Sequence, residues 1–345
     1  MTNERKSNYD LLRVISALSV IVLHANANYL ELADNSMISA NVFQNFINVI
    51  TRISVPIFVM LSGAFVLNGK KIANKKQFYI YSLKKLIPPY ICVYLFWGIY
   101  HTVMGIRHGY TSFLIISSWM KSSYGNLWFM PMILGLYLIA PIIYELKSVI
   151  SKKLYCKLAI ILMIWAMVSQ ATSQYVLPYS IGVVISYLSF FILGDIIYSS
   201  RINLKLPLWS AIPIIVALSL VTALFRIKCT QFYAIDPYRA FFSPVVVFLS
   251  LLVFISFGEI RLCDNYLIRN FSDITYYIYL IHTIVISFIY RIVDRSSYTA
   301  VIKVLIVSVV GTVISITVSV IWKRINDYTV KKVFHDFSSR KHISQ

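Results

Sequence analysis

The chain has 345 residues, of which 59% are hydrophobic and 13% are charged, whereas a soluble domain usually carries about a quarter charged residues. Apolar runs of about 20 residues, the length a helix needs to cross the hydrocarbon core of a bilayer, recur from end to end. The formal net charge of +19 is typical of basic connections that face an anionic membrane leaflet. The composition therefore indicates a polytopic membrane protein, and it excludes both a soluble protein and a nucleic-acid partner.

The apolar runs predict an all-α fold, a polytopic transmembrane helical bundle of about ten spans. A transmembrane β-barrel is excluded because its strands alternate apolar and polar residues, which these runs do not. The first span is too long in its apolar part to be a signal peptide, and no small-residue cleavage pattern follows it. The predicted spans, in chain order, cover about residues 10–29, 46–67, 84–104, 127–145, 156–175, 179–198, 207–225, 240–257, 271–290 and 299–322.

Lys and Arg in the connections predict the orientation of the spans. With ten spans, one set of connections together with both termini carries most of these residues, so we expect cytoplasmic N- and C-termini. The longest connections are expected at 68–83, which is basic, and at 105–126, which is rich in Gly, Ser and Tyr. Residues 323–345 are expected to form a basic, amphipathic cytoplasmic tail. The four cysteines form no CxxC pair and are expected to be packing residues.

The first span keeps Arg13 and His24 within the apolar stretch LLRVISALSVIVLHANANY (11–29). Eleven residues at about 100° each amount to about 20° more than three turns, so both side chains lie on one face, about 16 Å apart along the axis. Asp10 precedes Arg13 by one turn and is placed to pair with it. Ionisable residues inside a span indicate function. Taken alone, Arg13 is also consistent with an interfacial residue whose side chain snorkels to the headgroups. His24 is likewise consistent with a buried imidazole that is hydrogen-bonded to a carbonyl.

Five further segments accompany this pair in chain order. They read VPIFVMLSGAFVL (55–67), YSLKKLIPPYI (81–91), NLWFMPMILGLYLIAPII (126–143), FFILGDIIY (190–198) and ITYYIYLIH (274–282). The Ser-Gly pair of the first suits close helix contact. Together with Arg13, ten intervening residues and His24, this ordered set resembles the acyltransferase-3 family of integral membrane acyltransferases. In many members this last segment contains Ser-Tyr-x-x-Tyr-x-x-His, and here Thr275 stands at the Ser position and keeps the hydroxyl.

The resemblance implies an enzyme, an acyltransferase for groups other than aminoacyl groups. By this resemblance the enzyme is an O-acetyltransferase, since family members usually move an acetyl group from cytoplasmic acetyl-CoA to a hydroxyl of a cell-surface polysaccharide or lipid-linked glycan. His24 is then the catalytic base or the carrier of the acetyl group. Arg13, Lys84 and Lys85 lie at cytoplasmic span ends, where they would bind the CoA phosphates. Lys84 and Lys85 also fit plain positive-inside topology, and no metal is expected.

Other side chains are expected to support this site. The supporting residues are Asp10, Trp128, Tyr279 and His282. His282 is either a second pocket histidine or a hydrogen-bonded structural one, and Trp128 either stacks on a sugar or belongs to an aromatic belt. Glu31 and Asp34, just outside the first span, are candidates to orient the acceptor. Asp195 is expected to be an interfacial helix-end residue.

The rival interpretation is a transporter or flippase of a lipid-linked sugar or an exported polysaccharide. Transporters often repeat one half of the fold, and the helix with Arg13 and His24 has no second copy in the sequence. A sensor or scaffold would not need a histidine in mid-membrane. The expected partners are membrane lipids, acetyl-CoA and a glycan acceptor. The expected location is the inner or plasma membrane of a bacterium, because the Ile, Lys, Asn and Tyr usage suggests an A+T-rich genome.

Overall fold

The structure, a computed structural model, describes residues 7–30, 38–171, 179–200, 206–232 and 241–343. All regular structure in these ranges is helical, so the predicted all-α fold is confirmed. The elements are α1 (Ser7–Leu30), α2 (Ile38–Arg52), α3 (Ser54–Val66), the 3₁₀ helix η1 (Lys70–Ala73), α4 (Lys75–Arg107), α5 (Ser112–Leu127), α6 (Phe129–Val149), α7 (Lys152–Ala171), α8 (Tyr179–Ser200), α9 (Leu208–Phe232), α10 (Pro244–Glu259), α11 (Tyr266–Val293) and α12 (Ala300–Ile343).

The helices match the predicted spans closely. Within the described residues, nine helical segments are long and apolar enough to cross a bilayer, and they correspond to nine of the ten predicted spans. The remaining span, predicted at 240–257, is α10, an apolar helix of 16 residues. Its Leu249 and Phe254 are fully buried, so α10 packs inside the bundle. α12 continues past Trp322 without a break into the predicted tail.

The predicted second span is two helices, α2 and α3, which meet at Ile53. Pro56 lies in the first turn of α3, where its missing N–H is tolerated. The Ser54 hydroxyl donates a hydrogen bond of 2.6 Å to the Thr51 carbonyl at the junction. The break places Arg52 at the end of α2, inside the candidate span Val42–Val66. Irregular backbone at membrane depth is stable only where protein or a water-filled cavity surrounds it.

The connection predicted at 105–126 is mostly helical instead, as α5. The Thr111 hydroxyl accepts a hydrogen bond from the Leu114 backbone N–H and caps its first turn. α5 then packs against α4, and Trp119 and Ile115 lie against Gly98 and Gly105. Small residues such as Gly105 are typical of a loop in the sequence, but here they allow α4 and α5 to pack closely.

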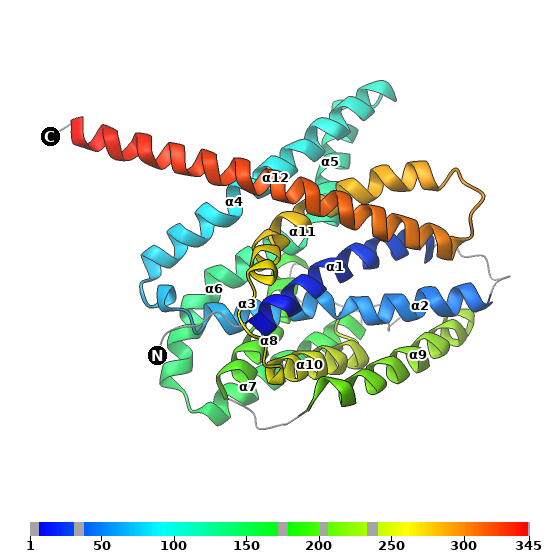
Figure 1. The fold of residues 1–345 in the computed structure, drawn as a ribbon, viewed down its shortest axis with the longest axis horizontal. Coiled ribbons are helices and arrows are strands. Elements are labelled where there is room, and N and C mark those ends of the chain that lie inside the picture. Colours follow the sequence, from blue (N-terminus) through cyan, green and yellow to red (C-terminus); the bar gives the residue numbers. More distant parts are fainter. Residues whose placement is uncertain (1–6, 31–37, 172–178, 201–205, 233–240, 344–345) are drawn as a thin grey trace.

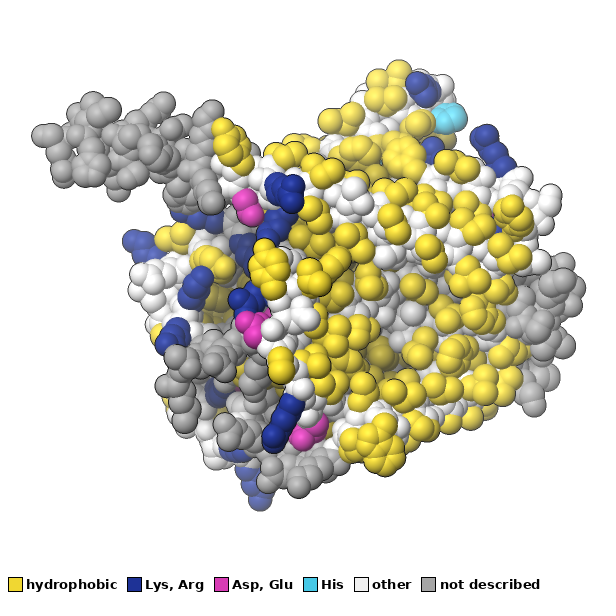
Figure 2. Space-filling model, in the orientation of Figure 1, with side chains coloured by type: hydrophobic (Ala, Val, Ile, Leu, Met, Phe, Trp, Pro, Cys, Tyr) yellow, Lys and Arg dark blue, Asp and Glu magenta, His cyan; other side chains and the backbone are white. Residues whose placement is uncertain are grey.

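The bundle has two distinct ends. Toward the left of Figure 1 lie the end of α3, the start of α4 and the connection between α6 and α7, and at the right lie the starts of α2 and α12. α1 packs against α2, α3, α11 and α12. Figure 2 shows Lys and Arg gathered along the left edge of the molecule, beside a broad apolar face. The cytoplasmic location of both termini stays a prediction from the Lys and Arg in the connections.

α3 and α8 approach each other through glycines. A Cβ atom on Gly63 would lie 1.8 Å from the backbone oxygen of Phe191, and one on Gly194 would lie 2.0 Å from the backbone oxygen of Met60. Gly63 belongs to the predicted Ser-Gly pair, so close contact at that pair is confirmed. Because backbone atoms meet at both positions, no side chain fits at either of them.

The substitution Gly63→Ala should therefore destabilise the protein, because α3 and α8 must separate to admit the methyl group. Overpacking of this kind costs about 1–3 kcal/mol, which we expect as a lower thermal unfolding midpoint of the purified protein in detergent. Gly311→Ala is the control, since a Cβ there would lie 3.7 Å from its nearest neighbour. That control should be neutral or slightly stabilising, and equal midpoints for the two variants would contradict the glycine contact.

Candidate active site

A cavity of about 510 Å³ lies among α1, α3, η1, α4, α6 and α11. The volume falls within the range of about 300–1,000 Å³ that is typical of small-molecule sites. Cations gather at one end of the cavity, whereas aromatic side chains line it along its length. Its lining includes Arg13, Lys70, Lys71 and Lys85 at that end and Phe58, Phe129 and Tyr279 at the other. Such a shape suits an extended ligand with phosphates at one end only.

Arg13 is held at the basic end by groups from three helices, α1, α3 and α11. Its Nη1 lies 3.9 Å from Asp10 Oδ1 and 3.5 Å from Ser272 Oγ. Its guanidinium carbon lies 5.2 Å from the centroid of the Phe65 ring. The Ser272 hydroxyl in turn donates a hydrogen bond of 2.6 Å to Asp10 Oδ1. The predicted pairing of Asp10 with Arg13 is confirmed, and Ser272 is a third member that the sequence analysis did not identify.

Of the two lysines predicted at the basic end, one lines the cavity, together with two others. Lys85 lines the cavity, but Lys84 is exposed and is not part of its lining. Lys70 and Lys71 do line it, although the sequence offered no signal to separate them from the other basic residues of the connection. They belong to η1, and the Lys71 ammonium lies 3.2 Å from the centroid of the Tyr81 ring.

Aromatic rings close the inner end of the cavity, and two histidines lie behind them. The rings of Phe129 and Tyr279 are 5.0 Å apart, and the Tyr279 ring is 5.6 Å from that of His282. The His282 ring is in turn 5.0 Å from that of His24. Neither histidine lines the cavity, but Val20, one turn before His24 on α1, does. The structure thus brings together two residues that are far apart in the sequence.

The hydrogen bonding of His282 sets the chemistry of this histidine pair. His282 is fully buried, and its Nδ1 lies 2.5 Å from the Tyr279 backbone oxygen. A carbonyl only accepts, so Nδ1 carries the proton and Nε2 keeps its lone pair. No residue of the described ranges gives that Nε2 a hydrogen-bond partner. His282 is therefore both hydrogen-bonded and positioned beside His24 as an acceptor.

Trp128 lies outside the cavity, in an aromatic cluster. Its ring centroid is 5.7 Å from that of Tyr187 and 5.5 Å from that of Phe241. The guanidinium carbon of Arg52 lies 5.0 Å from the Phe241 ring centroid. Trp128 is thus separated from the basic end and lies near the junction of α2 and α3. Glu31 and Asp34, the other acceptor candidates, lie outside the described residues.

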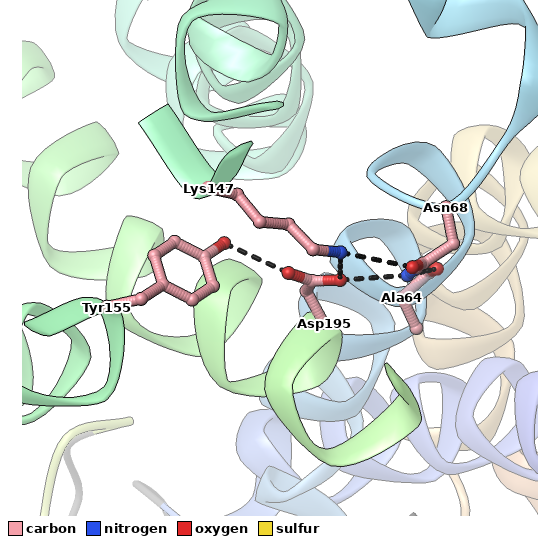
Figure 3. Close-up of polar contacts among 5 residues, drawn as sticks. All are labelled: Ala64, Asn68, Lys147, Tyr155 and Asp195. Atoms are coloured by element: carbon pink, nitrogen blue, oxygen red, sulfur yellow. Dashed lines mark hydrogen bonds and ion pairs between the residues drawn. The ribbon is translucent and has the colours of Figure 1, made fainter. Parts of the chain in front are cut away.

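Asp195 is not the interfacial helix-end residue that was expected (Figure 3). It is fully buried, and its Oδ1 accepts hydrogen bonds from Lys147 Nζ at 2.6 Å and Asn68 Nδ2 at 2.8 Å. Its Oδ2 accepts one from the Tyr155 hydroxyl at 3.0 Å. The close contact of α8 with α3 at Gly194 brings the carboxylate to Asn68 rather than to the surface. Asp195 does not line the cavity, so its role is to join α3, α6, α7 and α8.

A family model described as an acyltransferase domain, Acyl_transf_3, matches residues 6–322, nearly the whole chain. This range includes the cavity, the histidine pair and the Asp195 cluster. No curated protein and no solved structure matches the chain. In the part of the chain that the structure describes, no three His, Cys, Asp or Glu side chains gather as a set of metal ligands.

Removing Lys147 should destabilise the protein strongly, because the Asp195 carboxylate would lose its cation while it remains buried. Breaking a buried pair costs about 3–5 kcal/mol, so we expect Lys147→Met to lower the thermal midpoint in detergent markedly. The double variant Lys147→Met/Asp195→Asn should recover most of that loss.

The matched control is Lys75→Met, which removes a lysine from a different carboxylate, Glu145 of α6, in a pair whose side chains are 56% and 57% exposed. An exposed pair contributes about 1 kcal/mol at most, so the midpoint should hardly move. If Lys147→Met behaved like Lys75→Met, the Asp195 cluster would not hold the bundle together.

Proposed function

Because the chain belongs to the acyltransferase-3 family and is a membrane acyltransferase, we propose that it is an O-acetyltransferase of a bacterial plasma membrane. It transfers acetyl from cytoplasmic acetyl-CoA to a hydroxyl of a cell-surface polysaccharide or a lipid-linked glycan. The observation that carries this proposal is the pair His24 and His282, placed directly behind the inner end of a cavity whose other end is basic.

The cavity supports acetyl-CoA as the donor. CoA carries its phosphates at one end and the thioester at the far end of a flexible arm. Arg13 and Lys85, with Lys70 and Lys71, supply cations for the phosphates at the basic end. Along the arm, hydroxyl-bearing side chains, such as that of Thr275, line the cavity and suit the amides of that arm. The thioester would then reach the rings in front of the histidine pair.

His24 is the proposed base. As the acceptor oxygen attacks the thioester carbonyl carbon, His24 takes the hydroxyl proton, the new C–O bond forms and the C–S bond breaks. The imidazolium then returns the proton to the departing thiolate. His282 acts as a positioning residue, because its Nε2 would accept the single N–H of neutral His24 and so leave the other ring nitrogen of His24 free to act as the base. A route through acetyl-His24 needs the same residue as the nucleophile.

His24→Gln separates catalysis from structure, because an amide replaces a hydrogen bond but is no base at neutral pH. We expect acetyl transfer to glycan in membrane vesicles to fall by about 10²-fold or more, the scale of losing a general base. Binding of acetyl-CoA to the purified variant and the expression level should remain near normal. Transfer at the wild-type rate by a well-expressed His24→Gln protein would refute the proposed role.

Arg13→Lys tests the donor site, because an ammonium cannot reproduce the bidentate contacts of a guanidinium. A hydrogen bond to a charged group contributes about 1.5–3 kcal/mol, so acetyl-CoA affinity should fall about ten- to hundredfold in equilibrium binding. Lys76→Gln is the control, since Lys76 is exposed and is not part of the cavity lining. Equal affinities of the two variants would place the phosphates elsewhere.

A further inference from the structure

α12 reaches the wall of the donor cavity, although the described lining includes none of its residues. The helix continues past Trp322 and leaves the bundle on the side where α4 begins (Figure 1). There the Lys323 Nζ lies 3.9 Å from Asp273 Oδ2. One turn on, the Asn326 side-chain amide donates a hydrogen bond of 3.0 Å to the Tyr277 hydroxyl. Asp273 and Tyr277 of α11 both line the cavity, so the first turn of α12 after Trp322 is docked on its wall.

Asp273 lies toward the outer end of the cavity. On α11 the lining residues lie between Ser272 and Tyr279. Tyr279 is at the inner end, because its ring is next to that of His282. Ser272 contacts Arg13, so the start of this run is at the basic end. A ligand that fills the cavity would therefore place its outermost groups on the side of Asp273 and the neighbouring α12.

The ammonium group of Lys323 can serve such a ligand. Its side chain is 31% exposed, and its distance from the Asp273 carboxylate is longer than a hydrogen bond. An ammonium group has three donors, so it can bind an anionic group while it stays beside the carboxylate. Asp273 has further interactions of its own, so its charge does not depend on Lys323 alone. The fold thus holds a partly exposed cation at the rim of the cavity.

The proposed donor carries its phosphates at different distances from the thioester. The pyrophosphate follows the pantetheine arm, and the 3′-phosphate of the ribose lies beyond it. Arg13, Lys70, Lys71 and Lys85 belong to the cavity lining and suit the pyrophosphate. Lys323 lies just outside the lining. The phosphate farthest from the thioester therefore suits the lysine outside the lining.

We propose that Lys323 binds the 3′-phosphate of acetyl-CoA, and that α12 thereby completes the donor site. The contacts with Asp273 and Tyr277 position this turn of α12 on the rim. Lys323 and Asn326 lie beyond residue 322, where the match to the acyltransferase domain ends, so the assignment does not follow from family membership. It rests on the acetyl transfer proposed above and names the part of the donor that is recognised.

The test pairs a protein variant with a matching change in the ligand. Acetyl-CoA and acetyl-3′-dephospho-CoA differ only in that phosphate, and the Kd of each is measured with the purified protein in a non-ionic detergent. Lys323→Met should weaken acetyl-CoA binding about three- to tenfold, the range for a partly exposed contact between a lysine and an anion. The same variant should leave the Kd of the dephospho donor unchanged. Lys323→Arg keeps the cation and should keep most of the wild-type affinity for acetyl-CoA.

The matched control is Lys303→Met, near the start of α12, where Lys303 Nζ lies 3.6 Å from Asp294 Oδ1. Neither residue lines the cavity, so both Kd values should stay at those of the wild type. If Lys323→Met weakened both donors equally, or neither of them, Lys323 would not bind the 3′-phosphate. A wild-type protein that binds neither donor would instead overturn the function on which the proposal rests.

Discussion

The backbone contact between α3 and α8 is the constraint on which the site depends. Gly63 and Gly194 let the two helices meet without side chains between them. α3 can then present Phe58 and Phe65 to the cavity on its other face, while Asp195 reaches the residues that join α3 to α6 and α7. The wall of the cavity is thus held from behind by the ion pair of Lys147 and Asp195, which does not line the cavity.

Polar groups in the interior are divided between two regions, with the histidine pair between them. The region at the basic end is made of cations around Arg13 and is open to a cavity. The region around Asn48 is made of amides and guanidinium groups on α1, α2 and α9. α1 links the two regions because it carries Arg13, His24 and Asn26. This arrangement explains why one helix concentrates so many polar residues.

Much of the fold was predictable, because a span of about 20 apolar residues has few alternatives in a bilayer. The shared face of Arg13 and His24 followed from helix geometry alone. Asp195 was misjudged, because its burial depends on glycine contacts with a segment far away in the sequence. The buried amides of Gln44 and Asn48 on α2 were missed because uncharged amides stand out little in an apolar run. The position of Lys70 and Lys71 in the cavity lining was not predicted either, because positive-inside topology already explained two more lysines in that connection.

The ring layer at the end of the cavity has a consequence for the cell that houses the protein. An enzyme that receives one substrate from each side of a membrane could leave an open path through it. A continuous file of water along such a path would dissipate the proton gradient. The tilted rings of Phe129, Tyr279, His282 and His24 follow one another with centroids 5.0–5.6 Å apart, so successive rings are in contact along this line. Under the proposed function, such a row of rings would let an acetyl group pass from donor to acceptor while hindering a continuous file of water, so that acetyl transfer need not open a path for ions.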